Sequence, residues 1–352
     1  PNPMDMGRIR ETASQTALTV TAVLCLLVVI LLAAGAPPLE AVKHLFLGSL
    51  GSWMKFSHVL TAWIPLTLCA CGLLYTFRID LWNIGVEGQV MAGAVCATAV
   101  LRAGAESAAP SLWLAAAFPA GILGGGLWAW LAGVLKTRGG VNEIFAGLGL
   151  NFVAQAILLW LIFGPWKRPG IASMSGTEPF EPDLWLPTLS GIRISPFGLA
   201  LALAALVLTG WVLRRTRLGL ALKAIGRNRS AAFLHGLEPN RYTLAAMGLA
   251  GGLAGLAGTF QVTAVYHRLI PAISSNYGYL ALLVVMLSGF RAGPVPAIAL
   301  FFACLNVGSI QLPMMLHIDS SLSGVVQGVL VLAFLFFHSR RRRKHGGAGG
   351  GT

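Results

Sequence analysis

The chain has 352 residues, of which 56% are apolar and only 11% are charged. Soluble globular proteins carry roughly 25% charged residues, so this composition argues against the soluble enzyme classes and for a chain buried in lipid. The 25 Lys and Arg residues outnumber the 12 Asp and Glu residues. Such a basic balance indicates either a nucleic-acid partner or a membrane protein whose basic loops gather on one side.

Apolar runs long enough to cross a bilayer, which takes about 20 residues, recur along the chain. We expect crossings at residues 17–36, 58–77, 112–135, 144–164, 197–213, 242–266, 295–316 and 322–337. Two shorter apolar runs, 90–101 and 278–289, are typical of short or broken helices packed inside a bundle. The predicted fold is therefore all-α: a polytopic membrane helical bundle of about ten transmembrane helices.

The first predicted crossing ends in Ala34, Gly35 and Ala36, which resembles a signal-peptidase site. Its apolar run is longer than the core of a cleaved export signal, so we interpret it as an uncleaved first helix. The predicted organisation is an N-terminal segment over residues 1–16, a transmembrane domain over 17–338 and a basic, Gly-rich tail over 339–352.

The positions of the basic residues assign the two sides of the membrane. Ten alternating crossings put both termini on one side, and 18 of the 25 Lys and Arg residues fall in segments on that side. Loops rich in Lys and Arg face the cytoplasm, so we expect both termini and a loop at 214–241 to be cytoplasmic, and a loop at 165–195 to be external. This bias accounts for most of the net charge without nucleic acid.

Motifs for catalysis and for metal binding are missing from the sequence. No Gly-Lys pair occurs, so there is no nucleotide-binding P-loop, and no H-E-x-x-H motif occurs. The five cysteines all lie in apolar runs without metal-ligand spacing. We therefore expect no catalytic residue, no metal and no cofactor bound by this chain.

Three features indicate transport instead. Glycines cluster within the predicted crossings, where small residues let helix backbones approach: Gly121, Gly124, Gly125, Gly126, Gly248, Gly251, Gly252, Gly255 and Gly258. A polar interruption at 78–89 separates two apolar runs, and its glycines at 85 and 88 would allow a helix break that lines a cavity. The loop at 214–241 carries seven basic residues and one acidic residue, and its patterned character predicts a helix that docks on a partner protein, with a merely solvated loop as the alternative.

The polar interruption also carries the clearest resemblance to a known family. Residues 77–89 read F-R-I-D-L-W-N-I-G-V-E-G-Q, and further stretches read G-V-N-E at 140–143, L-N at 150–151, G-P-W-K-R-P-G at 164–170 and T-R-L-G at 216–219. Residues 224–228 read A-I-G-R-N, followed by two alanines at 231–232 and a glycine at 236. Together these resemble the nucleoside subgroup of ABC importer permeases, which are paired with lipoprotein receptors of the basic-membrane-lipoprotein type. Asp80 stands where the subgroup usually has Gly, and the stretch at 287–294 also departs from its pattern.

The resemblance implies a transport complex in a bacterial inner membrane. In it, this chain would pair with a related, shorter permease chain and with cytoplasmic ABC ATPase subunits, which would bind ATP and Mg²⁺. An extracytoplasmic lipoprotein would deliver the nucleoside. Permeases for simple sugars or branched-chain amino acids in the same superfamily remain alternatives, as do a secondary transporter or channel acting alone and a membrane scaffold without transport.

Two sets of residues are the expected functional positions. The candidates for lining the substrate path, with hydrogen bonding between helices as their alternative role, are Asn83, Glu87, Gln89, Asn142, Asn151, Gln155 and Gln261. The candidates for coupling to an ATPase are Arg217, Gly219, Ala224, Gly226, Arg227, Asn228, Ala231, Ala232 and Gly236.

Overall fold

The computed structural model describes residues 28–29, 32, 37–168, 176–189, 192–316 and 328. Nearly all of the predicted first crossing, the predicted last crossing at 322–337 and the predicted terminal segments at 1–16 and 339–352 lie outside the described residues. Within the described residues every regular element is helical, which confirms the predicted fold class. The chain divides into two compact units, residues 60–302 and the remainder.

The helices follow one another with short connections. Their bounds are α2 Pro38–Leu50, α3 Trp53–Arg78, α4 Val86–Ala103, α5 Pro110–Thr137, α6 Glu143–Phe163, η1 Pro182–Leu184, α7 Pro196–Arg215, α8 Arg217–Arg227, α9 Arg229–Leu234, α10 Pro239–Phe260, η2 Gln261–Tyr266, α11 Tyr277–Leu287 and α12 Val295–Leu316. Five stretches, namely α3, α5, α6, α7 and the continuous α10–η2, are long and apolar enough to cross a membrane, and each overlaps a predicted crossing over most of its length. The predicted short run at 90–101 belongs to the longer helix α4, and the run at 278–289 forms α11.

One helix was missed by the sequence analysis. Helix α2 has only 13 residues, and Glu40, Lys43 and His44 interrupt its apolar character, so it lacks the length and hydropathy of a crossing. In its own unit it packs closely against α12, because a Cβ on Gly308 would overlap the carbonyl oxygen of Leu45. Tertiary packing, rather than its own sequence pattern, explains this helix.

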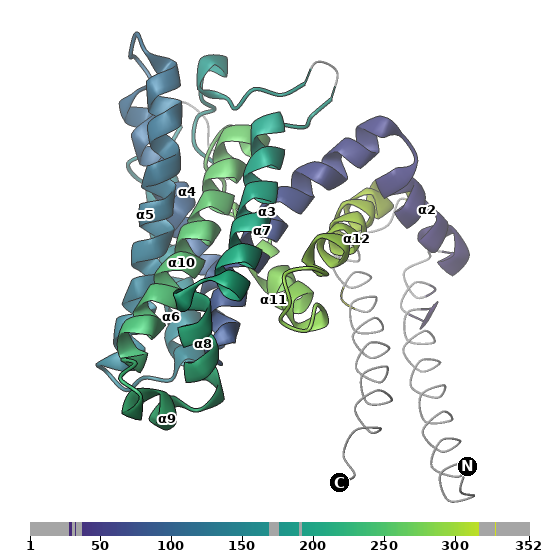
Figure 1. Ribbon diagram of the computed structural model, residues 1–352. Coiled ribbons are helices and arrows are strands. Elements are labelled where there is room, and N and C mark those ends of the chain that lie inside the picture. The colour runs from purple at the N-terminus through teal and green to yellow at the C-terminus, as the bar shows by residue number, and fades with distance from the viewer. Residues whose placement is uncertain are drawn as a thin grey trace, which may run out of the picture. The chain divides into compact units, whose positions relative to one another are not determined.

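The unit over residues 60–302 is a bundle with α3 and α10 at its centre. Both are largely buried, whereas α5, α6 and α7 expose much of their apolar surface, as expected of helices that face lipid. Figure 1 shows α5, α6, α7 and α10 running along one another, with α8 and α9 at one end of this column. Helix α10 packs most extensively on α5 and α4, and α4 also packs on α6.

Glycines bring the backbones of the central helices together. A Cβ on Gly255 of α10 would overlap the carbonyl oxygen of Gly121 of α5, and a Cβ on Gly93 of α4 would overlap the backbone of Gly255. Gly125 and Gly251 oppose each other in the same way. The predicted role of the glycine clusters in close helix packing is therefore confirmed, except at Gly248, where no atom lies within 4 Å of an added Cβ.

This packing predicts opposite effects on stability for two glycine-to-alanine substitutions in α10. We expect Gly255→Ala to lower the unfolding temperature of the detergent-purified protein, because overpacking a helix contact costs about 1–3 kcal/mol. Gly248→Ala should leave the unfolding temperature unchanged or raise it slightly, because alanine favours a helix over glycine by up to about 1 kcal/mol. Equal unfolding temperatures for the two variants, measured by a thermal shift assay, would contradict the close packing at Gly255.

Candidate functional site

The segment between α3 and α4 breaks the helical path at the predicted polar interruption. Helix α3 ends at Arg78, a turn follows in which Leu81 donates its N–H to the carbonyl of Thr76, and α4 begins at Val86. Asp80 in this turn has φ +60°, a left-handed conformation that glycine adopts without strain and Asp tolerates. The turn geometry therefore explains why Gly is usual at this position in the family that the sequence resembles.

Glu87 lies between the N-termini of two helices. It stands in the first turn of α4 and is 2% exposed, and its Oε1 accepts the backbone N–H of Tyr279, in the first turn of α11, at 3.1 Å. A Cβ on Gly278 would lie 3.0 Å from the same Oε1, so the close approach of α11 requires glycine. Because helix N-termini carry partial positive charge, these two ends stabilise a buried carboxylate. The second oxygen, Oε2, has no hydrogen bond among the described residues.

Asn151 connects α6 to this pair of helix ends. Its Oδ1 accepts the N–H of Gly88 at 2.8 Å, and its Nδ2 donates to the carbonyl of Ile84 at 3.0 Å. The same Nδ2 lies 3.3 Å from the hydroxyl oxygen of Tyr279. One side chain therefore satisfies a backbone group of the turn and one of the first turn of α4, and also contacts α11.

Asn83 and Gln89 form a closed amide pair beside Glu87. Asn83 donates to Gln89 at 3.1 Å and Gln89 donates back at 2.8 Å, and each side chain is 1% exposed. The pair clamps the break to the first turn of α4. In this conformation the two side chains bond each other within the segment from the turn into α4.

Gln155 and Gln261 secure the irregular segment before α11. Gln155 of α6 donates to the carbonyl of Pro271 at 3.1 Å, and Gln261 donates to the carbonyl of Ile273 at 3.3 Å and to Ser275 Oγ at 3.2 Å. Gln261 begins η2, a π-helical turn at the end of α10. Such turns are rare and occur frequently at functional sites.

Asn142 is placed elsewhere. It is the N-cap of α6, where its Oδ1 accepts the N–H of Ile144 at 2.8 Å, and it is exposed. The other six predicted path residues make hydrogen bonds that connect α4 to α6 and α11, and that connect α6 and η2 to the segment before α11. We call these six residues the polar network.

The exposed groups beside the polar network were not singled out by the sequence analysis. Tyr279 is 41% exposed, Asn276 is exposed, and Ser275 is half-buried, with its Oγ 3.0 Å from the hydroxyl of Tyr266. Ser275 and Asn276 have φ +48° and +58°, which ends the irregular segment in a left-handed turn directly before α11. Tyr279 gave no sequence signal, because the groups that it contacts, Glu87 of α4 and Asn151 of α6, are distant in the sequence.

Residues 176–189, the longest described stretch of the predicted external loop, pack on the end of η2. Phe180 donates its N–H to the carbonyl of His267 at 2.8 Å, and Thr177 exchanges two hydrogen bonds with Leu269. The ring of Trp185 stacks on His267 with 3.9 Å between the centroids. Burial lowers the pKa of His267, as does the nearby charge of Arg193, so the imidazole in this stack is neutral at pH 7.

The predicted coupling loop contains two helices at the other end of α7. Helix α8 is amphipathic, with Leu222 and Ile225 buried and Arg217 and Arg227 exposed. A Cβ on Gly226 would overlap the carbonyl oxygen of Arg78, so α8 lies directly against the turn that leads into the polar network. The amphipathic helix anticipated in this loop is therefore present.

The other predicted coupling residues have structural roles that can be stated one by one. Gly219 is buried against the backbone of α7, and Asn228 caps α9 by accepting the N–H of Ala231 at 2.9 Å. Ala224 and Ala231 are half-buried, Ala232 is 5% exposed and Gly236 has φ +81°. The small residues thus hold α8 and α9 on the bundle.

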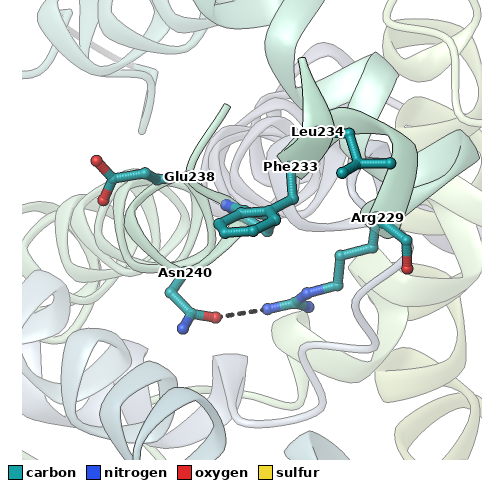
Figure 2. A pocket seen from close by; sticks show the side chains of 7 residues that line it. Arg229, Phe233, Leu234, Glu238 and Asn240 are labelled. Carbon is teal, nitrogen blue, oxygen red and sulfur yellow. Dashed lines mark hydrogen bonds between the residues drawn. The ribbon is translucent and has the colours of Figure 1, made fainter. Parts of the chain in front are cut away.

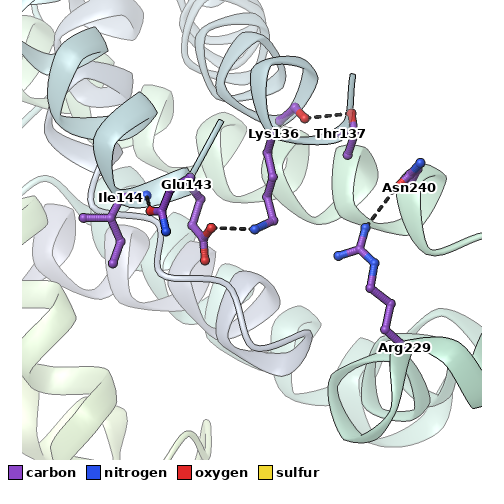
Figure 3. Close-up of polar contacts among 8 residues, drawn as sticks. Lys136, Thr137, Glu143, Ile144, Arg229 and Asn240 are labelled. Atoms are coloured by element: carbon purple, nitrogen blue, oxygen red, sulfur yellow. Dashed lines mark hydrogen bonds and ion pairs between the residues drawn. The ribbon is translucent and has the colours of Figure 1, made fainter. Parts of the chain in front are cut away.

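The outward surface of α9 is formed by larger side chains. Phe233 is 63% exposed and Leu234 is 84% exposed, and together with Arg229, Glu238 and Asn240 they line a hollow of about 540 Å³ (Figure 2). Arg229 of α9 donates to Asn240 of α10 at 2.8 Å, and Lys136 of α5 forms an ion pair with Glu143 of α6 (Figure 3). These two polar links pin neighbouring helices together around an exposed apolar patch.

A lipid-facing helical bundle with a broken polar centre and amphipathic helices at one end defines a membrane transport permease, and comparisons with known proteins specify which kind. The family model described as branched-chain amino acid transport system / permease component matches residues 56–335, so the chain belongs to this family of ABC importer permeases. It is a multi-pass membrane protein.

Three curated relatives are similar along most of their length. The glucose ABC transporter permease TsgB13 of Haloferax volcanii is 30% identical over 90% of this chain and 85% of its own. The nucleoside ABC transporter permease NupB of Lactococcus lactis is 25% identical over 80% and 79%, and the guanosine ABC transporter permease NupP of Bacillus subtilis is 25% identical over 86% and 87%. A second permease of each of these organisms also matches, at 24–28% identity.

The contact between Glu87 and α11 generates a prediction. Glu87→Ala should lower the unfolding temperature, because leaving the N–H of Tyr279 without an acceptor costs about 1–3 kcal/mol. Glu87→Gln keeps an oxygen at the acceptor position and should unfold close to the wild-type temperature. A thermal shift assay on both variants checks this, and an unchanged temperature for Glu87→Ala would show that the contact contributes nothing to stability.

Proposed function

We propose that this chain forms part of the translocation path for a nucleoside in an ATP-driven importer of a bacterial inner membrane. The observation that carries the proposal is that the signature at 77–89 forms the buried turn from α3 into α4, where side chains of α4 and α6 bond this turn and the start of α11. This signature supplies the helix break, the amide pair and Glu87, and the exposed groups of α11 lie beside it.

The residues beside the polar network suit a nucleoside chemically. A base stacks on an aromatic face, which the exposed ring of Tyr279 offers, and ribose hydroxyls need hydrogen-bond partners, which Asn276 and Ser275 offer. Glu87, Asn83, Gln89, Asn151, Gln155 and Gln261 are fully or partly buried and bonded to one another or to nearby backbone. In our proposal these residues border the path, and some of them exchange partners when the helices move. Asn142, at the start of α6 on the side expected to be cytoplasmic, is kept as a candidate only at the exit of the path.

A simple sugar is the second candidate substrate. The glucose permease TsgB13 shares more identity with this chain than the two nucleoside permeases do, and a sugar would use the same hydrogen-bonding groups without the aromatic ring. The signature at 77–89 and the exposed Tyr279 lead us to prefer the nucleoside. A branched-chain amino acid is disfavoured because the polar network contains no cation that could pair with its carboxylate.

The proposed complex contains further chains. The second matching permease in each of the three organisms supports pairing of this chain with a related permease. ATP and Mg²⁺ would bind to cytoplasmic ABC ATPase subunits, and an extracytoplasmic lipoprotein would deliver the substrate at the side of the loop 176–189. This chain would bind no cofactor and carry out no chemistry of its own.

The substrate is tested by reconstitution of the purified complex with its receptor in proteoliposomes. We expect ATP hydrolysis to be stimulated several-fold more by the nucleoside-loaded receptor than by the receptor offered glucose or leucine. Tyr279→Ala should reduce nucleoside uptake at least tenfold, whereas Tyr279→Phe should keep most of it, because the ring is retained. Stimulation by glucose alone would assign the chain to the sugar importers.

The exposed apolar patch of α9, which we propose docks on the ATPase, is tested separately. Leu234→Asp and Phe233→Asp place a charge on an exposed apolar patch, so they should fold normally but weaken ATPase association at least tenfold, or about 1.4 kcal/mol. They are sharper probes than Ala232, whose side chain is buried in the fold of this chain. Leu189→Asp, in the loop predicted to be external, is the matched control because Leu189 is 50% exposed. Pull-down of the ATPase that is equal for all three variants would contradict a docking role for α9.

A further inference from the structure

Three arginines from separate parts of the chain line one cavity. The end of α3 contributes Arg78, the end of α7 contributes Arg214 and the segment after α11 contributes Arg291, around a cavity of about 310 Å³ that Leu213 and Phe290 also line. Arg78 is half-buried, whereas Arg214 and Arg291 are exposed. Three like charges around one cavity repel one another, and a bound anion would reduce this repulsion.

Within the described residues, these arginines have no anionic partner. The ion pairs found there join Lys136 to Glu143 and Arg241 to Glu238, and neither pair includes an arginine of the cavity. The Nε of Arg78 is buried and makes no hydrogen bond within the described part of the chain. A buried donor without an acceptor costs about 1–3 kcal/mol, so the cavity is suited to a ligand that accepts hydrogen bonds.

An apolar hollow continues from the cavity along α7. It has a volume of about 360 Å³ and shares Gly210, Arg214 and Ala292 with the arginine cavity. It extends over Leu206, Val207 and Trp211, and Arg215 lines its edge. The side chains of Val207 and Trp211 are 67% and 57% exposed, on a helix that is long and apolar enough to cross the membrane. The cationic cavity therefore opens onto a surface that faces lipid.

We propose that the cavity binds the phosphate of an anionic phospholipid such as phosphatidylglycerol, with an acyl chain of the same molecule lying along Val207 and Trp211. Arginine is the side chain best suited to a phosphate, because its fork of N–H donors matches the phosphate oxygens. The ends of α3 and α7 stand where a crossing helix leaves the hydrocarbon, and basic pockets between membrane helices bind anionic headgroups at this depth.

The position of the site gives the lipid a structural consequence. Arg78 ends α3 and directly precedes the turn against which Gly226 of α8 packs, and Phe290 contacts Phe77 with 5.1 Å between the ring centroids. A bound phosphate would therefore hold α3, α7 and the segment after α11 together beside α8. The inference rests on the membrane location of the chain and does not depend on which solute it transports.

The lipid is tested by native mass spectrometry of the full chain in a neutral detergent, titrated with phosphatidylglycerol or phosphatidylcholine. We expect phosphatidylglycerol to bind about tenfold more tightly than phosphatidylcholine. Arg291→Gln and Arg214→Gln should each weaken its binding roughly fivefold, the effect of removing one basic residue near an anionic headgroup. Arg138→Gln is the matched control, because Arg138 is an exposed arginine at the end of α5, away from the cavity.

Additional measurements separate a lipid from a free phosphate and from a protein partner. Inorganic phosphate alone should not displace the lipid at equal concentration, and Trp211→Ser should weaken phosphatidylglycerol binding while leaving the protein folded, because Trp211 is largely exposed. Equal binding of the two lipids, or unchanged binding in both arginine variants, would overturn the proposal. Loss of ATPase association in these variants with unchanged lipid binding would instead assign the arginines to an acidic protein surface.

Discussion

Inside a bilayer a helix can break only where the protein itself satisfies the freed backbone groups, and this constraint organises the centre of the bundle. The break between α3 and α4 frees the carbonyl of Ile84 and the N–H of Gly88, and both are bonded by Asn151. The start of α11 raises the same need, and Glu87 meets it by accepting the N–H of Tyr279. Each polar side chain thus makes the hydrogen bonds to the backbone that water would make in a soluble protein.

The same constraint joins the centre of the bundle to α8. The turn after Arg78 is held between α8, through the close approach of Gly226, and the amide pair of Asn83 and Gln89 that follows it. A displacement of α8 would therefore press on the segment that positions Glu87. Coupling between two sites requires an element that both can move, and the turn 79–85 is a short, non-helical element of that kind.

Much of the fold is readable from the sequence because lipid imposes a simple length and hydropathy rule. The crossings at α3, α5, α6, α7 and α10 were predicted to within a few residues at most ends, and the helix break followed from the polar run at 78–89. This rule does not predict α2, because its charged residues lower its hydropathy. It also underestimates α4, which has 18 residues, because the first turn of α4 carries the polar residues Glu87 and Gln89. Both helices are stabilised by neighbours that are distant in the sequence.

The sequence predicted which residues belong to the candidate site, but not which groups these residues hydrogen-bond. Polar residues in apolar runs are costly and therefore conspicuous, which is why Glu87 and Asn151 were identified. Which groups they bond depends on three-dimensional proximity, as between Asn151 and the hydroxyl of Tyr279, and no spacing rule relates residues that are 128 positions apart. Asn142 was assigned to the path by the same reasoning and lies elsewhere, because an Asn before an apolar run equally indicates a helix N-cap.

The closed hydrogen bonding of the polar network has a consequence for transport. A substrate that entered the break would have to compete with short bonds such as the 2.8 Å contact between Gln89 and Asn83, and leaving either amide unpaired in a buried position is costly. The network would therefore open only as a substrate or a shifted helix supplies replacement partners. The groups that are already exposed, Asn276 and Tyr279, would be contacted first. Ser275, beside them, is held in a left-handed backbone conformation that strains a serine, so a rearrangement of this turn when partners are exchanged would release that strain.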